Sequence, residues 1–351
     1  MTIVPQQMPE GPRRSTLSER LLTPTRTREA YLAGIVVVAA LLISIPYGTF
    51  LSASNISEII VDSSIIIIVS ASQAMIVLTK QIDLSVGSVM GLSCMIVGVT
   101  AANHPGVPAI VLVLEGAGLG ALFGLVNASI IAGLQLPSMI VTLATLEIYR
   151  GVVPAIASSV FTYQLPNSVL ALARGSILGI PRLEFYALVV VILVGYFISQ
   201  TRTGRELYAI GSNPDAAALT GIPARKRTFW LFITSGTVAG IAGVLWLAFY
   251  GAAETTSALG FEFTTVTVVV IGGMNIWGGS GSIRGVILGA LILTGVTNAL
   301  VIANVSVNWQ QAVNGTILLV AVSGNVMLTK RTARRLMLAQ RAREKQIAAV
   351  S

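Results

Sequence analysis

The chain is poor in charged residues, and it has almost no cysteine or histidine. Only 10% of its 351 residues are charged, whereas 54% are hydrophobic. Charged residues make up about a quarter of an ordinary soluble domain, so this deficit excludes a water-soluble fold. The single cysteine, Cys94, excludes a disulfide within the chain and a cysteine metal site. The single histidine, His104, lies in the turn AANHPGVP without a partner, and we expect no catalytic role for it.

The sequence also lacks the motifs of the common catalytic sites. It contains no G-x-x-x-x-G-K-[ST] phosphate loop, and its glycine cluster GGSGSIRG has no lysine and lies between two apolar segments. No metal-ligand cluster and no nucleophile–base pattern is present. We therefore expect no catalytic residues, no metal site and no ATP hydrolysis in this chain itself.

Long apolar segments occupy most of the sequence. About 20 apolar residues are needed to cross a bilayer as a helix. Unbroken runs such as 63–69 and 187–197 lack the alternation of a membrane β-strand. We expect an all-α, polytopic membrane protein with about ten transmembrane helices. The expected spans are 31–50, 58–79, 84–102, 108–134, 139–158, 183–200, 228–250, 262–277, 283–303 and 309–328.

The basic residues predict the orientation of these spans. The net charge is +8, and most of the 22 Lys and Arg lie in an arm at 1–30, a loop at 201–227 and a tail at 329–351. Because basic residues favour the cytoplasmic side, both termini are expected there, and the loop 159–182 is expected in the periplasm. The distribution of the basic residues is thus explained by the topology of a transmembrane domain, 31–328. We expect no nucleic-acid partner. The tail is expected near anionic lipid.

Two polar breaks interrupt the apolar pattern. The first, QAMIVLTKQIDLSVGSVMGLSC, carries Lys80 and Asp83, and the second is VVVIGGMNIWGGSGSIRG. Asn275 corresponds to Asp83, and Gly279-Ser280 corresponds to Gly87-Ser88.

Two interpretations of the breaks stay open. They are either tight cytoplasmic turns, in which Asp83 caps the next helix and the serines are incidental, or irregular backbone that lines a path or carries a gate. Membranes tolerate such backbone only where protein or a cavity satisfies it. The candidate path or gate residues are Asp83, Ser85, Gly87, Ser88, Asn275, Gly279 and Glu115.

Charged residues inside the spans are costly and therefore informative. Glu147 and Arg150 are three residues apart on one helical face, and we expect them to pair. Glu58 and Asp62 are four apart near an outer helix end, where water reaches them. Glu115 has no partner in the sequence, so it is either paired across helices or lines a cavity. Proton relays use such groups, which makes Glu115 the argument for a proton-coupled carrier.

Glycines recur at every fourth residue in several spans. This spacing lets membrane helices approach closely, so we assign these glycines to helix packing, with a substrate path as the alternative. They are Gly116, Gly120 and Gly124, then Gly236 and Gly240, then Gly285 and Gly289.

The loop 201–227 contains a short capped helix. Asn213 is a suitable N-cap, Pro214 suits the first helical position, and Asp215 complements the helix dipole. The helix is expected from Asp215 to Thr220, with Gly221 ending it. It is either a shape that a partner grips or an ordinary loop helix.

Three motifs in order, KQIDLSVGSVMGL, GRELYAIGSNPDAAALTGIP and IGGMNIWGGSGSIRGVILGAL, resemble the permease subunits of ribose-type ABC importers. The resemblance covers about 31–328, and the family includes permeases for several pentoses, hexoses, deoxyhexoses and autoinducer-2. It implies a second permease subunit, alike or different, in the bacterial inner membrane. It also implies a separate ATPase that binds ATP and magnesium, and a periplasmic substrate-binding protein. The substrate is not specified.

The resemblance further implies that the segment 204–223 docks into the ATPase as a coupling helix. The positions carried over are Gly204, Arg205, Glu206, Tyr208, Asn213, Pro214, Asp215 and Gly221. One departure is Lys80 with Gln81, where the family has glycines, so a close backbone approach is not expected there. The expected function is import of a monosaccharide or autoinducer-2-like molecule by alternating access. A proton-coupled carrier is the alternative, and a membrane enzyme would need a site that the sequence does not offer.

Overall fold

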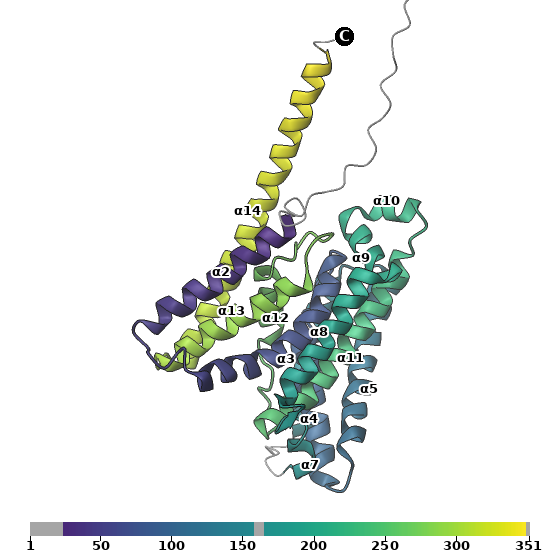
Figure 1. The fold of residues 1–351 in the computed structure, drawn as a ribbon. Coiled ribbons are helices and arrows are strands. Elements are labelled where there is room, and N and C mark those ends of the chain that lie inside the picture. Colours follow the sequence, from purple (N-terminus) through teal and green to yellow (C-terminus); the bar gives the residue numbers. More distant parts are fainter. Residues whose placement is uncertain (1–23, 158–164, 349–351) are drawn as a thin grey trace, which may run out of the picture.

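The computed structural model describes residues 24–157 and 165–348, and these residues are helical almost throughout (Figure 1). The helices are α2 (Pro24–Ser44), α3 (Ala53–Leu78), α4 (Val86–Asn103), α5 (Ala109–Ala128) with the π-helical turn η1 (Ser129–Gly133), α6 (Ser138–Ala157), α7 (Asn167–Leu170), α8 (Arg182–Gln200), α9 (Arg202–Ser212), α10 (Pro214–Leu219), α11 (Ala224–Tyr250), α12 (Phe261–Ile271), α13 (Ile283–Ile302) and α14 (Val307–Ala348). Within the described residues, strand structure is limited to a small antiparallel pair, β1 (Ser176–Ile177) and β2 (Ile180–Pro181).

Seven helices in the described part of the chain are long and apolar enough to cross a membrane. They are α3, α4, α5 with η1, α6, α8, α11 and α13. Of the other expected spans, the first corresponds to a shorter apolar stretch, Leu32–Ser44, and the last to the beginning of α14. The polytopic all-α class is therefore confirmed, and the count of ten crossings stays a prediction.

The expected eighth span, 262–277, is corrected by the structure. Helix α12 has only 11 residues, which extend about 16 Å, and it ends at Ile271. A Cβ built on Gly98 of α4 would lie 3.0 Å from the Ala253 side chain, and one on Gly91 would lie 2.6 Å from the Ser257 carbonyl oxygen. The segment 251–260 therefore runs irregularly along α4 before α12 begins. Hydropathy alone does not separate this arrangement from a full helix.

Glycines hold α5 and α11 in close contact, as the spacing predicts. A Cβ on Gly120 would overlap the Gly236 carbonyl oxygen, and one on Gly240 would overlap the Gly116 carbonyl oxygen. Gly124 similarly lies against α11, and Gly285 and Gly289 of α13 lie against α12. The packing interpretation of the glycine repeats is confirmed.

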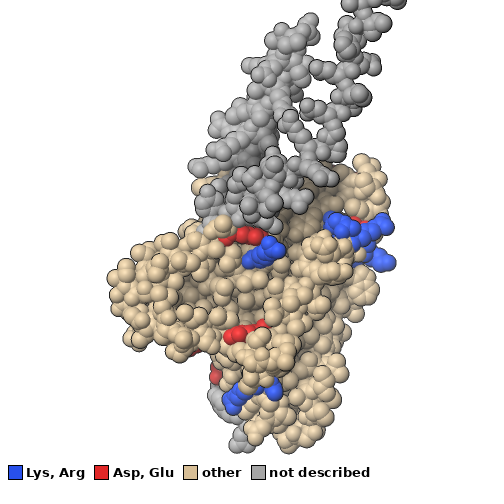
Figure 2. Space-filling view, in the orientation of Figure 1, with Lys and Arg blue, Asp and Glu red and all other residues tan. Residues whose placement is uncertain are grey.

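The ends of the molecule differ in what they carry. Figure 1 shows α9 and α10 at one end, together with the start of α2 and the end of α14, and α7 at the opposite end. Figure 2 shows basic side chains near both ends of the molecule and a broad, mostly uncharged surface between the two ends. The loop 159–182 contains the one-turn helix α7, and residues 158–164 lie outside the described part.

We predict that Gly120→Ala destabilises the protein by about 1–3 kcal/mol, because the added methyl forces α5 away from α11. The measurement is the thermal unfolding midpoint of the detergent-solubilised protein. Gly118→Ala is the matched control, since it lies on the same helix with nothing within 4 Å of its built Cβ. Equal midpoints for the two variants would contradict the close-packing assignment.

Candidate functional site

The expected short helix in the loop 201–227 is present as α10. Its N-cap is Asn213, whose side-chain oxygen accepts a hydrogen bond from the Ala216 N–H at 3.1 Å, and Pro214 occupies the first turn. The chain leaves the helix at Gly221, which has a φ of 78°. Leu219, the last residue of α10, is 91% exposed, so the end of α10 carries an exposed apolar side chain.

The sequence interpretation missed a second helix before α10. Residues 202–212 form α9, and its N-terminus is capped by Thr201, whose hydroxyl accepts from the Gly204 N–H at 2.9 Å. Gly204 is needed because a Cβ there would overlap the Phe197 carbonyl oxygen of α8. The signal for this helix was present as a Thr N-cap three residues before the buried Gly204.

Glu206 connects α9 to α11. It is 7% exposed, and its carboxylate accepts hydrogen bonds from the Arg227 Nε at 2.7 Å and the Arg202 Nε at 3.1 Å. The hydrogen bond from Arg227 holds the pKa of Glu206 below its usual value. Its folded-state pKa is thus lower than in the unfolded chain, so the bridge stabilises the fold at neutral pH and is lost as the pH falls through that lowered pKa.

The end of α9 touches both polar breaks. The Gly279 N–H donates to the Leu78 carbonyl at 3.0 Å, which joins the second break to the end of α3. Ser212 donates to the Gly279 carbonyl at 3.4 Å, and a Cβ on Gly211 would overlap the Leu78 carbonyl. Tyr208 donates to the Gly281 carbonyl at 3.1 Å. We call this contact of Leu78, Gly211, Ser212 and Gly279 the coupling junction.

The first break does make a close backbone contact, but not at Lys80 and Gln81, where none was expected. Lys80 adopts a φ of 63°, a conformation that favours glycine, and Gly278 is packed so closely that its built Cβ would lie 2.7 Å from the Lys80 side chain. The backbone contact occurs two residues earlier, at Leu78, and the Lys80 side chain remains exposed.

Asp83 and Asn275 make equivalent turns. Asp83 Oδ1 accepts from the Ser85 N–H at 2.9 Å, and Asn275 Oδ1 accepts from the Trp277 N–H at 3.1 Å. Both are Asx turns, in which the side chain binds the backbone two residues later. The correspondence of the two breaks is therefore confirmed at these positions.

Asp83 is also the centre of a buried polar cluster. It is 2% exposed, and its carboxylate accepts from the Ser85 hydroxyl at 2.6 Å and the Ser235 hydroxyl at 3.0 Å. Asn127 donates to the Ser85 hydroxyl at 2.8 Å, and Ser88 donates to the Ser85 carbonyl at 2.8 Å. Ser85 is thus not incidental, because it joins the first break to α5 through Asn127, while Asp83 joins the break to α11 through Ser235.

The expected ion pair between Glu147 and Arg150 is wrong. Arg150 Nη2 lies 3.9 Å from the Glu262 carboxylate of α12, and the guanidinium donates to the carbonyls of Ser257 and Ala258 at 2.9 and 3.1 Å. Glu147 is exposed. Helical spacing made the local pair plausible, but the half-buried guanidinium instead binds two backbone carbonyls of the segment 251–260 and lies beside the Glu262 carboxylate.

Gly87 and Glu115 each lie against a specific residue of another helix. A Cβ on Gly87 would overlap the Glu262 carboxylate, so the glycine leaves room for the partner of Arg150. Glu115 accepts a hydrogen bond from the Thr100 hydroxyl of α4 at 2.8 Å. Of the two alternatives for Glu115, the structure therefore shows the contact across helices.

A polar cavity of about 470 Å³ lies where α3, α11, α12, α13 and α14 meet, and the sequence interpretation did not find it. None of the candidate path residues is among its lining residues. Its polar and aromatic lining consists of Glu58, Asp62, Trp246, Phe249, Tyr250, Phe261, Thr264, Thr294, Thr297, Asn298, Gln310, Gln311 and Asn314. One available signal was the one-turn spacing of Glu58 with Asp62 and of Trp246 with Tyr250.

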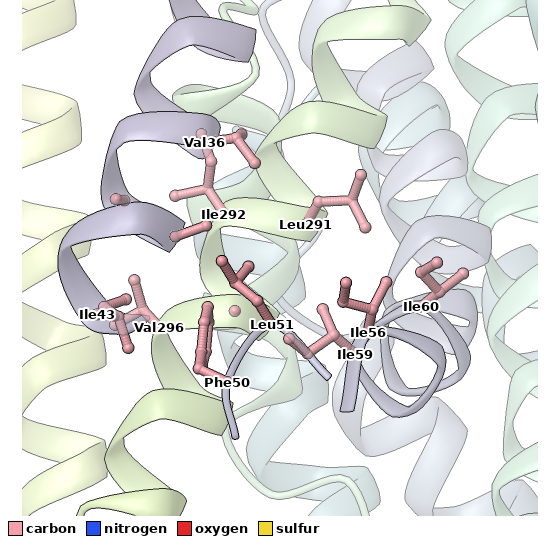
Figure 3. A pocket seen from close by; sticks show the side chains of 13 residues that line it. Val36, Ile43, Phe50, Leu51, Ile56, Ile59, Ile60, Leu291, Ile292 and Val296 are labelled. Atoms are coloured by element: carbon pink, nitrogen blue, oxygen red, sulfur yellow. The ribbon is translucent and has the colours of Figure 1, made fainter. Parts of the chain in front are cut away.

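A second cavity, of about 280 Å³, has a different lining. Figure 3 shows aliphatic side chains such as Val36, Leu51 and Ile292 pointing into it from α2, the chain before α3, and α13. Its lining side chains offer no hydrogen-bonding group. Such a space suits apolar groups only and cannot orient a hydrophilic ligand.

We predict that Arg150→Met destabilises the protein by about 3–5 kcal/mol, because it leaves the buried Glu262 carboxylate without its ion-pair partner and the Ser257 carbonyl without its hydrogen bond. Glu147→Gln is the control and is expected to change the unfolding midpoint little. Thermal unfolding in detergent compares the two. If Glu147→Gln were as damaging as Arg150→Met, the pair predicted from the sequence would be correct after all.

We predict that Gly211→Ala disrupts the coupling junction, because its methyl overlaps the Leu78 carbonyl. The expected result is a tenfold or greater loss of folded protein. Gly151→Ala, with nothing within 4 Å of its built Cβ, is the control. The yield in size-exclusion chromatography is the measurement, and a wild-type yield for Gly211→Ala would show that the contact is dispensable.

Comparison with known proteins agrees with the motifs and with this architecture. A family model described as the permease component of branched-chain amino acid transport systems matches residues 55–322. The D-allose transport system permease protein AlsC of Escherichia coli is 31% identical over 84% of this chain and 90% of its own length.

Two further relatives cover similar shares. The autoinducer 2 import system permease protein LsrC of an Enterobacter species is 31% identical over 86% of each chain. The fructose import permease protein FruG of Bifidobacterium longum is 30% identical over 92% of this chain and 96% of its own. The chain therefore belongs to the permease-component family of ABC transport systems that includes these sugar and autoinducer-2 permeases.

Proposed function

We propose that this chain imports a monosaccharide or an autoinducer-2-like molecule by alternating access, as the membrane subunit of an ABC importer. The observation that supports it most is the coupling junction. The exposed helix α10 follows directly from Ser212, and Gly211 and Ser212 pack against the ends of both breaks. A force on α10 therefore reaches the transmembrane helices through backbone contacts.

In this proposal α10 docks into a separate ATPase, which binds ATP and magnesium. Closure of the ATPase on ATP moves α10 and α9, and α9 is held to α11 by Glu206 and Arg227. The movement passes to α3 through Leu78 and to the second break through Gly279. Two permease subunits, identical or different, then open outward.

The same proposal assigns the two ends of the molecule. The end with α10, the start of α2 and the end of α14 faces the cytoplasm of a bacterial cell. The end with α7 and the small hairpin faces the periplasm and receives a substrate-binding protein. The basic residues of the loop 201–227 favour this orientation in the inner membrane.

A sugar-like substrate is supported by the printed functions of the relatives, which name allose, autoinducer 2 and fructose. The proton-coupled alternative depends on Glu115, which the structure places in a hydrogen bond with Thr100. Uptake at constant ATP in the presence of an uncoupler separates the two. Persistence of uptake supports the importer, and its collapse supports the carrier.

We predict that Gly221→Val, combined with Asp215→Arg, reduces both ATPase co-purification and uptake by tenfold or more. Gly221 has a φ of 78°, which a β-branched residue rarely adopts, and Asp215 lies in the first turn of α10. His104→Ala, near the opposite end of the molecule, is the control. Retained ATPase binding and transport in the double variant would refute the coupling assignment.

A further inference from the structure

The polar cavity of about 470 Å³ combines two carboxylates with an aromatic wall. Glu58 and Asp62 of α3 line it, and Trp246 and Tyr250 of α11 line it with ring centroids 4.3 Å apart. Resting on the proposed function, we propose that this cavity receives the substrate and that Asp62 and Thr294 are determinants of its recognition. The ligand class is an uncharged polyhydroxyl molecule of monosaccharide size.

The charge of the cavity favours a ligand that donates hydrogen bonds. Among the described residues, neither Glu58 nor Asp62 has a hydrogen-bond or ion-pair partner, and no Lys, Arg or His lines the cavity. Ionised carboxylates only accept hydrogen bonds. Hydroxyl groups satisfy them, whereas a phosphate or carboxylate on the ligand would be repelled.

Two buried atoms in the wall lack partners within the described part of the protein. Thr294 is 6% exposed, and its hydroxyl makes no hydrogen bond. The side-chain oxygen of Asn314 is also buried and unbonded. A buried polar group without a hydrogen bond lowers the stability of the fold. Thr294 and Asn314 both line the cavity, where a ligand can reach them. A ligand that carries several hydroxyls satisfies both.

The aromatic wall supplies the complementary apolar face. Trp246 stacks at a tilt against Tyr250, and Phe261 meets the Trp246 ring edge to face with centroids 5.8 Å apart. Sugar rings present an apolar C–H face between their hydroxyls, which suits such a wall.

A cationic ligand would also be attracted to rings and carboxylates. We favour the neutral one because a ligand hydroxyl can donate to the Asn314 oxygen and also accept from the Thr294 hydroxyl, whereas an ammonium group only donates.

Arg150 stabilises the chain segment that forms one wall of the cavity. Leu259 and Phe261 line the cavity, while Arg150 binds the carbonyls of Ser257 and Ala258 in the same segment. The irregular segment therefore keeps a defined shape on its cavity side. This places the cavity beside the non-helical segment 251–260, which runs along α4.

The test uses the complete importer, with its ATPase and binding protein, in liposomes loaded with ATP. Uptake of radiolabelled D-ribose, D-allose and D-fructose is measured for the wild type, Asp62→Leu, Asp62→Glu and Thr294→Val. ATP hydrolysis is measured in the same samples. Glu184→Gln, a carboxylate on α8 outside the cavity, is the matched control.

We expect Asp62→Leu and Thr294→Val to lower the uptake of the carried sugar tenfold or more while ATP hydrolysis continues. Asp62→Glu should recover part of the uptake. Wild-type uptake in Asp62→Leu and Thr294→Val would overturn the cavity assignment. Uptake of radiolabelled choline or spermidine that depends on Asp62, without sugar uptake, would overturn the neutral ligand. Wild-type uptake that continues in liposomes without ATP would instead refute the proposed function, because an ABC importer depends on ATP.

Discussion

Backbone groups inside a bilayer must find partners within the protein, and the departures from helix in this structure follow that requirement. The segment 251–260 is irregular beside α4, and Arg150 satisfies two of its carbonyls. The two polar breaks are closed by Asx turns at Asp83 and Asn275, and the Leu78 carbonyl is satisfied by the Gly279 N–H. Each departure is thus supported by a contact from another helix, which makes it specific and well defined.

The coupling junction and the polar cavity are connected through α3 and α13. Helix α3 carries Asp62 in the cavity wall and Leu78 in the junction, 16 residues or roughly 24 Å apart. Helix α13 carries Thr294 in the cavity, and it begins directly after the second break. A displacement at either break therefore moves the cavity wall as well. In the proposed function, this is the physical route from the ATPase to the substrate.

Glycine has two different tasks in this chain. At Gly120 and Gly236 it lets α5 and α11 cross at close range, which is a matter of stability. At Gly87 and Gly211 it leaves space for a carboxylate and a carbonyl that belong to irregular segments, which concerns the site. Spacing identifies the first kind because helix packing is periodic. The second kind follows no period, since the partner comes from a distant part of the chain.

The sequence by itself determined the class of protein, the short helix α10 and the equivalence of Asp83 and Asn275, whereas the match of Gly87–Ser88 with Gly279–Ser280 was wrong because the first pair lies inside α4. These depend on hydropathy, on capping residues and on short-range side-chain bonds, which are local properties. The partner of Arg150, the half-length helix α12 and the polar cavity were decided only by the tertiary structure. Glu262 is 112 positions away from Arg150, and the cavity lining comes from five helices. On apolar helices, hydropathy does not tell which face meets another helix, because almost every face is equally apolar.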